Sequence, residues 1–169
     1  MSDFLDQIEQ AVPALRRYAR ALTRNLDLAD DLVQDCLERA ISRRSLFRPR
    51  GPVRPWLFTI LLNLFRNSLR SERRHGTAVG LDDLATEPAT PAPQHGHMEL
   101  AELARAIQSL PPEQKEALLL IALEGFSYNE AAKILGIPQG TLMSRLGRAR
   151  TTLRASNGNS SEPRLRTVK

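Results

Sequence analysis

The side chains best suited to chemistry lie between residues 139 and 148. In this segment Leu142 and Leu146 are spaced i, i+4, so both face a core if the segment is a helix. Amides, hydroxyls and guanidinium groups then occupy the outward faces: Gln139, Thr141, Ser144, Arg145 and Arg148. Such groups hydrogen-bond to base edges and phosphates, so the chemistry expected here is nucleic-acid recognition.

A short helix and a tight turn must position that segment. Ser127 and Glu130 have the spacing of a capping box, which starts a helix. Gly136 suits a turn that needs a positive φ, and Pro138 suits the first turn of the following helix. The order predicts a helix-turn-helix with residues 139–150 as its second helix. The alternative is a plain helical hairpin with a solvated basic face.

Residues 1–75 predict a bundle of three amphipathic helices, over about 3–24, 27–43 and 55–74. Pro13 is expected to kink or split the first helix, and Asp27 is the expected N-cap of the second. Residues 45–55 read as a loop, and Trp56 is favoured as a core side chain over a stacking platform. The inward stripe of the second helix is predicted to contain Leu28, Leu32, Val33, Cys36, Leu37, Ala40 and Ile41.

A connector separates this bundle from the helix-turn-helix. Residues 76–98 hold three prolines, no Lys or Arg and no helical periodicity, which predicts a flexible acidic linker. Helical spacing returns at Met98, and a second helix is expected from Pro112 to Glu124. The polar tail, 156–169, is predicted to be disordered. The fold class is therefore all-α: an N-terminal helical bundle (1–75) and a C-terminal four-helix domain with the helix-turn-helix (99–155), two small domains joined by a flexible linker.

Composition narrows the class of protein further. The formal net charge is +5, and residues 1–75 hold 14 Lys and Arg against 9 Asp and Glu, which favours a polyanionic partner. Cys36 is the only cysteine, which fits a reducing cytoplasm. No secretory signal or membrane-spanning run is visible, so no membrane insertion is expected. The sequence contains no nucleophile constellation, metal cluster or Gly-rich phosphate loop, so neither an enzyme nor a cofactor is predicted.

Several segments together resemble a known family, the sigma-70 superfamily. The C-terminal match covers IPQGTLMSRLGRAR (137–150), with LPPEQ (110–114) and EGFSYNEAA (124–132) before it. In the N-terminal part, ADDLVQDCLERA (29–40) resembles the region that docks on polymerase core. RPWLFTILLNLFRN (54–67) resembles the helix that reads the −10 element. The spacing of these segments is similar to that of small two-domain, extracytoplasmic-function (ECF) sigma factors. The amino-acid sequence around 15–24 and 110–125 resembles their general-stress subgroup in alphaproteobacteria.

The resemblance implies roles for residues on both domains. Polymerase core, through the β′ and β subunits, is the expected partner of an acidic helix face: Asp31, Leu32, Gln34, Asp35 and Glu38. The alternative is that this acidic face is simply solvated and binds no partner. Promoter DNA at the −10 element is the expected partner of a basic group, with the loop 45–55 holding an unstacked base: Arg48, Arg50, Asn63, Arg66, Asn67, Arg70, Arg73 and Arg74. The −35 element is expected to be read by Gln139, Gly140, Thr141, Ser144, Arg145 and Arg148.

The family also implies a regulatory partner, an anti-sigma factor that covers both domains. Two other functions stay open at this point. A sigma-like decoy would sequester an anti-sigma factor without touching DNA, and it would not need the basic residues. A simple helix-turn-helix regulator would not need the N-terminal bundle.

Overall fold

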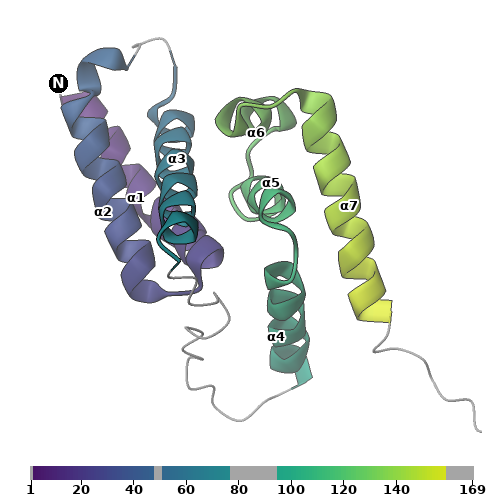
Figure 1. Cartoon of the computed structure of the whole chain (residues 1–169). Coiled ribbons are helices and arrows are strands. Elements are labelled where there is room, and N and C mark those ends of the chain that lie inside the picture. The colour runs from purple at the N-terminus through teal and green to yellow at the C-terminus, as the bar shows by residue number, and fades with distance from the viewer. Residues whose placement is uncertain (1, 48–50, 77–94, 159–169) are drawn as a thin grey trace, which may run out of the picture.

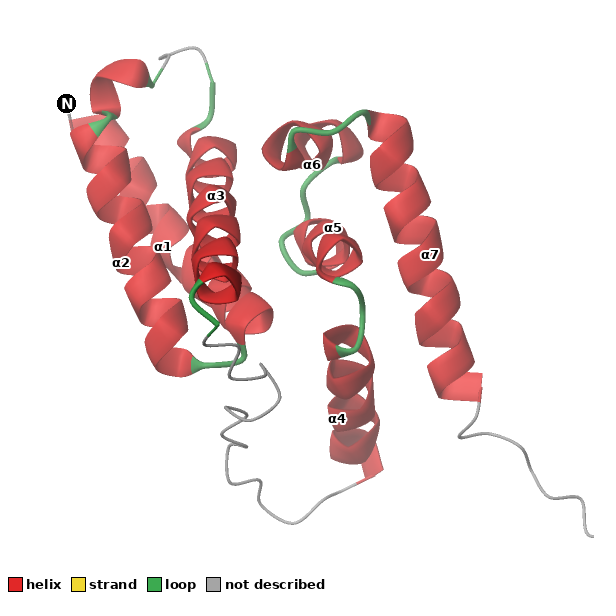
Figure 2. Cartoon of the chain, in the orientation of Figure 1, coloured by secondary structure: helices red, strands yellow, loops and turns green. Residues whose placement is uncertain are grey.

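A computed structural model describes residues 2–47, 51–76 and 95–158 of the chain. Throughout these residues the regular elements are helices, as Figure 2 shows, which confirms the all-α fold class. Two groups of helices lie side by side in Figure 1, one coloured purple to teal and the other green to yellow. We refer to them as the N-terminal bundle and the C-terminal domain.

The N-terminal bundle contains α1 (Ser2–Thr23), α2 (Leu26–Ser42) and α3 (Val53–Arg74), with a short 3₁₀ turn η1 (Arg44–Leu46) after α2. The three α-helices pack on one another around fully buried side chains that include Leu15, Leu57 and Leu61. Cys36 lies in this core, and its Sγ is 3.4 Å from the carbonyl oxygen of Leu57. Desolvation raises the pKa of the Cys36 thiol to about 12. The thiol is therefore a structural group, as its position on the apolar stripe predicts.

The structure differs from two local predictions about these helices. Pro13 does not split the first helix, because α1 runs unbroken from Ser2 to Thr23. Pro13 is exposed, so the backbone groups that it leaves without partners in the helix can be solvated. The N-cap of α2 is Asn25 and not Asp27: the Asn25 side chain accepts a hydrogen bond from the Leu28 amide at 3.0 Å. Asp27 instead lies within the first helical turn, where a carboxylate favours the positive end of the helix dipole.

The buried stripe of α2 is narrower than predicted. Leu28 and Ile41 were expected to point inward, but they are 45% and 48% exposed. Both lie at the edges of a stripe whose centre is filled by small or branched side chains, so the neighbouring helices do not reach them. The side chains of α2 that are buried are Ala29, Leu32, Val33, Cys36 and Ala40.

The C-terminal domain contains α4 (His95–Gln108), α5 (Pro112–Ala122), α6 (Tyr128–Leu135) and α7 (Gln139–Gly158). Helix α4 begins three residues before Met98, and α7 extends to Gly158, past the predicted end of the domain at 155. Helix α5 is the centre of the domain, with five consecutive buried residues from Glu116 to Leu120. Gly125 follows with a φ of 69°, a conformation that suits glycine and lets the chain turn into α6.

The two domains pack directly against each other. Helix α3 contacts α6, and α1 contacts α5. Phe58 of α3 and Phe126, which lies between α5 and α6, are both buried where the domains meet. Tyr18 of α1 is fully buried beside them, and its hydroxyl donates to the backbone carbonyl oxygen of Glu116 at 3.2 Å. We call this contact of α1 and α3 with α5 and α6 the domain interface.

Candidate nucleic-acid and partner interfaces

The helix-turn-helix is built as its sequence predicts. At the start of α6 the Ser127 hydroxyl accepts from the Glu130 amide at 3.3 Å, and the Ser127 amide donates to Glu130 Oε2 at 2.9 Å. The hydrogen bond from the Ser127 side chain is the main cause that lowers the pKa of Glu130. Gly136 ends α6 with a φ of 67°, in the left-handed region, and α7 begins at Gln139. Leu142 and Leu146 are buried, which fixes the rotation of α7 about its axis.

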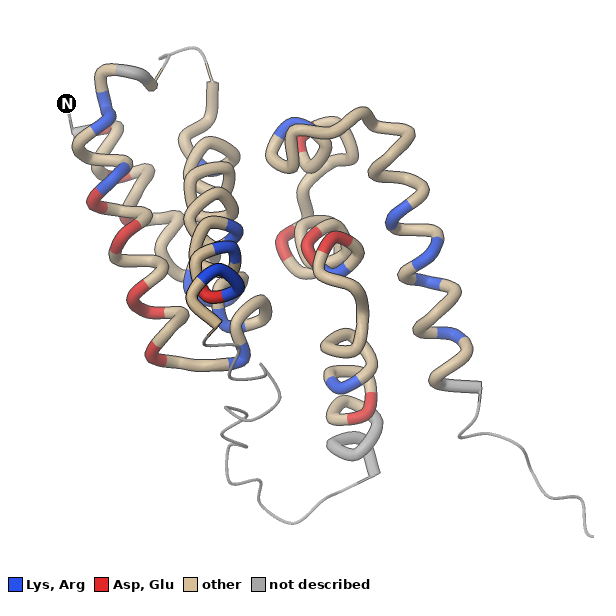
Figure 3. The backbone as a smooth tube through the Cα atoms, in the orientation of Figure 1, with Lys and Arg blue, Asp and Glu red and all other residues tan. Residues whose placement is uncertain are grey.

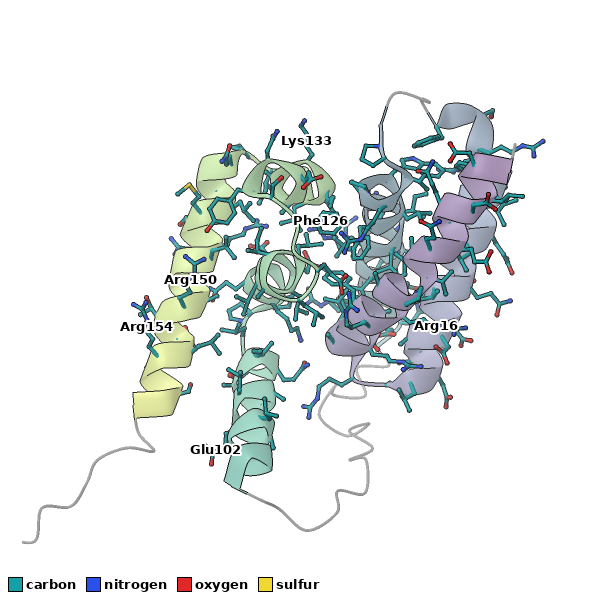
Figure 4. The ribbon with its side chains drawn as sticks, turned by 180° about the vertical axis from the view of Figure 1, so that it is seen from behind. Arg16, Glu102, Phe126, Lys133, Arg150 and Arg154 are labelled. Carbon is teal, nitrogen blue, oxygen red and sulfur yellow. The ribbon has the colours of Figure 1, made fainter. Side chains whose placement is uncertain are left out.

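The first part of α7 presents a polar surface to solvent. Five of the six predicted −35 residues are exposed: Gln139, Gly140, Thr141, Ser144 and Arg148. Beyond its first turns α7 carries basic residues in Figure 3, and Figure 4 shows Arg150 and Arg154 on this helix. The outward face is therefore polar and cationic, as a surface that binds DNA requires.

Arg145 is the sixth predicted −35 residue, and its side chain is held within the domain. Its Nη2 is 3.1 Å from Glu113 Oε2 on α5, and the Arg145 side chain is 19% exposed. The prediction that Arg145 points outward is therefore corrected: its guanidinium group lies over α5. The side chain of Glu113 is 69% exposed, so this ion pair is solvated and weakly held.

Helix α3 carries the second candidate DNA surface, in the bundle. In Figure 3 basic residues gather on the C-terminal half of α3. Five of the predicted −10 residues are exposed there: Asn63, Asn67, Arg70, Arg73 and Arg74. Arg48 and Arg50, also predicted for this surface, lie outside the described residues.

Arg66 is the −10 residue that departs from the expectation of a solvent-facing side chain. It crosses the domain interface to Glu116 of α5: Arg66 Nη2 lies 2.6 Å from Glu116 Oε2, and Arg66 Nε lies 3.2 Å from the same oxygen. This hydrogen bond is the main cause that raises the pKa of Arg66. Glu116 is 3% exposed, so its carboxylate depends on the Arg66 pair.

Glu124 forms a second buried carboxylate site at the same interface. Arg17 of α1 binds both of its oxygens, with Nε to Oε1 at 2.9 Å and Nη2 to Oε2 at 2.8 Å. Arg54 of α3 donates to Glu124 Oε2 at 2.9 Å and to the Glu124 carbonyl oxygen at 2.8 Å. The Arg54 guanidinium also lies 4.3 Å from the centre of the Phe126 ring, a cation–π contact. Figure 4 shows Phe126 where α5 and α6 face the bundle.

Sequence reasoning missed Glu116 and Glu124. Both lie among apolar residues that predict a buried helix, and a buried carboxylate without a partner is costly. A carboxylate in a stretch of apolar residues was therefore the signal that the sequence offered. It indicates a nearby cation but does not say which arginine provides it.

The acidic face of α2 is exposed, in keeping with a partner surface. Asp31, Gln34, Asp35 and Glu38 all reach solvent, and acidic residues follow the outer side of α2 in Figure 3. Leu32, predicted for the same surface, is 8% exposed and packs into the bundle core. The polymerase contact predicted for Leu32 stays a prediction. Its side chain positions the helix.

Trp56 packs within a cluster of three aromatic rings. Its ring centroid lies 6.2 Å from that of Phe4 and 5.3 Å from that of Phe47, and Phe4 and Phe47 are 5.5 Å apart. The cluster joins the start of α1, the end of η1 and the start of α3. It therefore closes the end of the bundle at which α3 begins, and Trp56 has the packing role that was favoured for it.

Neither a metal centre nor a membrane span emerges from this geometry. Among the described residues no three His, Cys, Asp or Glu side chains gather as metal ligands would. The helices of the described ranges are also too short or too polar to cross a bilayer.

Two helical domains, one carrying a helix-turn-helix and each with an exposed cationic surface, are typical of a DNA-binding class of protein. Family profiles place it more narrowly. Residues 8–62 match the family described as the Sigma2 domain of PhyR, and residues 100–153 match sigma-70, region 4. The chain is 44% identical over 150 residues to the ECF RNA polymerase sigma factor EcfG of Rhodopseudomonas palustris, which covers 89% of this chain and 82% of that protein. The chain belongs to the ECF sigma factors of the sigma-70 superfamily. It is a transcription initiation factor and not an enzyme.

Solved structures agree with this family. The sigma factor RpoE of Bartonella quintana, crystallised with the anti-sigma factor NepR, is 35% identical with a TM-score of 0.77, over 95% of this chain and 100% of that one. The anti-anti-sigma factor PhyR of the same organism, also crystallised with NepR, is 23% identical with a TM-score of 0.58. That match covers 89% of this chain but 49% of PhyR, and it shows a shared fold alone.

Proposed function

We propose that this sigma factor binds RNA polymerase core and directs it to promoters by melting and reading a −10 element and reading a −35 element. The observation that carries the proposal is the presence of two separate polar, cationic faces, on α3 and α7, in a chain 44% identical to the ECF sigma factor EcfG. A protein that only binds other proteins does not need either face.

The −35 element is read by α7 entering the major groove. Gln139, Thr141 and Ser144 present an amide and two hydroxyls at the N-terminal end of the helix, where recognition helices contact base edges. Arg148, one turn beyond Ser144, suits a phosphate contact. Gly140 leaves open space beside the helix, since an added Cβ would meet nothing within 4 Å. This space lets the sugar-phosphate backbone approach closely.

The −10 element lies along α3 as a separated strand. Asn63 and Asn67 are one turn apart and offer amides to unpaired bases, while Arg70, Arg73 and Arg74 offer charge to phosphates. The segment between η1 and α3, which contains Arg48 and Arg50, holds an unstacked base in this proposal; the predicted loop 45–55 is shorter in the structure, because η1 includes residues 45 and 46 and α3 begins at Val53. That role stays a prediction, because residues 48–50 lie outside the described ranges.

Polymerase core docks on the acidic face of α2. Asp31, Asp35 and Glu38 place carboxylates on one exposed side, with Gln34 hydrogen-bonded to Glu38 at 3.1 Å. A basic helical surface of the β′ subunit complements this charge, and electrostatic complementarity provides both steering and specificity.

An anti-sigma factor is the proposed regulator. RpoE of B. quintana was crystallised with the anti-sigma factor NepR, and the likeness to that sigma factor spans nearly the whole chain. We expect a small protein of that class to bind this chain across both domains.

The sigma-like decoy is kept as the second candidate because the N-terminal profile is that of PhyR. A decoy that binds NepR-like proteins needs the fold but has no use for exposed arginines along α3 and α7. The higher identity to EcfG and the exposed cationic faces favour the sigma factor.

Transcription in vitro distinguishes the two functions. Core polymerase is incubated with a genomic fragment library, with and without the chain, and transcript starts are mapped. New starts that share two upstream elements support the sigma factor. A matched variant, Asn67→Ala with Arg70→Ala, keeps the fold and should lose those starts. Absence of new starts, together with tight binding of an anti-sigma protein, supports the decoy.

A further inference from the structure

The domain interface contains Arg66, a residue that the sequence predicts at the −10 strand. Arg66 lies on α3 one turn from Arg70 and next to Asn67, on the helix proposed to carry the −10 strand. Its guanidinium group is bound by Glu116 of the other domain, through two nitrogens. A carboxylate and a phosphate offer an arginine the same kind of anionic oxygens. Glu116 therefore occupies Arg66 with an acceptor that resembles DNA.

Geometry at the interface also opposes simultaneous binding of a DNA strand. Arg66 Nη1 lies 3.5 Å from the carbonyl oxygen of Leu135, at the end of α6. The side chain of Arg66 is 28% exposed, and that of Glu116 is 4% exposed. A nucleic-acid strand that reaches Arg66 must therefore separate α3 from α5 and α6.

We propose that the packed arrangement is a self-masked state, in which Glu116 stands in for a phosphate on Arg66 and Glu124 latches the domains together through Arg17 and Arg54. Opening the interface exposes the two carboxylates to water and releases Arg66 for DNA. The effect on DNA binding rests on the proposed function, whereas the ion pairs that hold the domains together are observed in the structure alone.

The latch is suited to reversible opening. Each glutamate is buried, but its arginine partners reach the surface: the side chains of Arg17 and Arg54 at Glu124 are 51% and 37% exposed, and that of Arg66 at Glu116 is 28% exposed. Water can reach the cations from the rim, so separation does not strand a charge in an apolar core. By linkage, anything that binds the released Arg66 favours the open state, and the open state favours that binding by the same factor.

Glu116→Gln tests the latch in the full chain. The change keeps the size of the side chain and removes the charge that holds Arg66. The matched control is Glu113→Gln on the same helix, because Glu113 pairs with Arg145 inside its own domain. Spin labels at Ser42→Cys and Thr151→Cys, both exposed and one in each domain, report the interdomain distance. Cys36 is fully buried, so labelling is selective for the introduced thiols.

The unmodified chain and Glu113→Gln should show the same narrow distance distribution. Glu116→Gln should show a longer, broader one, with the open-to-closed ratio raised roughly tenfold or more, since loss of one partner from a buried pair is strongly destabilising. The second readout is the polarisation of a labelled single-stranded DNA of mixed sequence. Glu116→Gln should bind this strand several-fold more tightly, whereas Arg66→Gln should open the chain without that gain.

Arg17→Gln is the second variant, used if Glu116→Gln does not fold by circular dichroism. It should also lengthen the distance, and its residue belongs to neither proposed DNA face. Unchanged distances in the folded glutamate variant, or opening without tighter binding of the strand, overturn the latch. Transcription in vitro distinguishes failure of the latch from failure of the sigma function. If the chain gives new promoter starts but Glu116→Gln leaves the interdomain distance unchanged, the latch is rejected and the sigma function is kept. Opening without any promoter starts rejects the sigma function and keeps the interface.

Discussion

The ring of Phe58 meets the ring of Phe126 edge to face, with centroids 4.9 Å apart and planes at 76°. The two residues are 68 positions apart in the chain and belong to different domains. Arg54 lies over the Phe126 ring, at 4.3 Å from its centre, and donates to Glu124. An apolar contact at the centre, with charged pairs around it, is the anatomy of a specific interface.

Phe126→Ala is expected to weaken the domain interface. The change removes a buried aromatic ring, its contact with Phe58 and its cation–π contact with Arg54, at a cost of about 2–4 kcal/mol. Guanidinium unfolding followed by circular dichroism measures this loss. Phe126→Leu retains apolar volume and should lose less. Equal stabilities for the alanine variant and the parent would contradict the role of this ring.

The Cys36 thiol is expected to resist thiol reagents in the folded chain. With its pKa at about 12, only roughly 10⁻⁴ of the group is thiolate at pH 8, and the side chain is buried. Reaction with a disulfide reagent should be slow in buffer and fast in denaturant. Rapid reaction without denaturant would show that the bundle opens around this residue.

The raised pKa of Cys36 also predicts a pH dependence. The stability that the neutral thiol contributes is fully present below the unfolded pKa, near 8.5, and is lost as pH rises toward 12. The parent should therefore lose stability relative to Cys36→Ala between pH 8 and 10, measured as the difference in melting temperature. A constant difference across this range would refute the assignment.

Ser127→Ala should destabilise the helix-turn-helix through its cap. Loss of an N-cap side chain costs about 1 kcal/mol. Hydrogen bonds from Ser127 lower the pKa of Glu130, so their contribution is present above the unfolded pKa, near 4.3, and disappears as pH falls below it. Urea unfolding at pH 7 and near pH 3.5 should show the variant losing less on acidification than the parent. The same loss in both proteins is the contrary result.

Arg148→Ala should reduce binding of duplex promoter DNA and its dependence on salt. One lost phosphate contact lowers the slope of log K against log salt by about 0.9. Arg154→Ala is the matched control, since Arg154 is exposed on the same helix but lies beyond the proposed recognition residues. Equal effects of the two variants would assign the binding to general charge on α7.

Charge reversal on α2 should uncouple the chain from polymerase core. Asp35→Lys with Glu38→Lys places like charges against a basic docking surface and should weaken binding at least about tenfold. Asp6→Lys with Glu9→Lys, both exposed on α1, is the control with the same change in net charge. Binding to immobilised core polymerase separates the two pairs, and a comparable loss in both would remove α2 from the docking surface.

Local order was predictable because it depends on local spacing. Leu142 and Leu146, the capping box of Ser127 and the turn at Gly136 all act within a few residues, and the structure contains each of them as predicted. Edges were harder. The exposure of Ile41 depends on how far neighbouring helices extend, which periodicity does not encode.

Contacts between distant segments could not be predicted from spacing. Arg66 was predicted to face DNA, and its type and position on α3 are compatible with that role. Arg66 and Glu116 are 50 residues apart in the sequence, and their pairing depends on how the two domains dock. Arg145 illustrates the same problem within one domain, because its long side chain reaches from α7 to Glu113 on the adjacent α5.

The position of Trp56, the only tryptophan in the chain, decides what optical measurements report. Its ring contacts Phe4 and Phe47, which both belong to the N-terminal bundle. Indole emission is therefore a reporter of that bundle and has no counterpart in residues 99–155. Comparing a fluorescence melt with a circular dichroism melt tests whether the two domains unfold as one cooperative unit: coincident curves indicate that they do, and separated curves indicate two transitions.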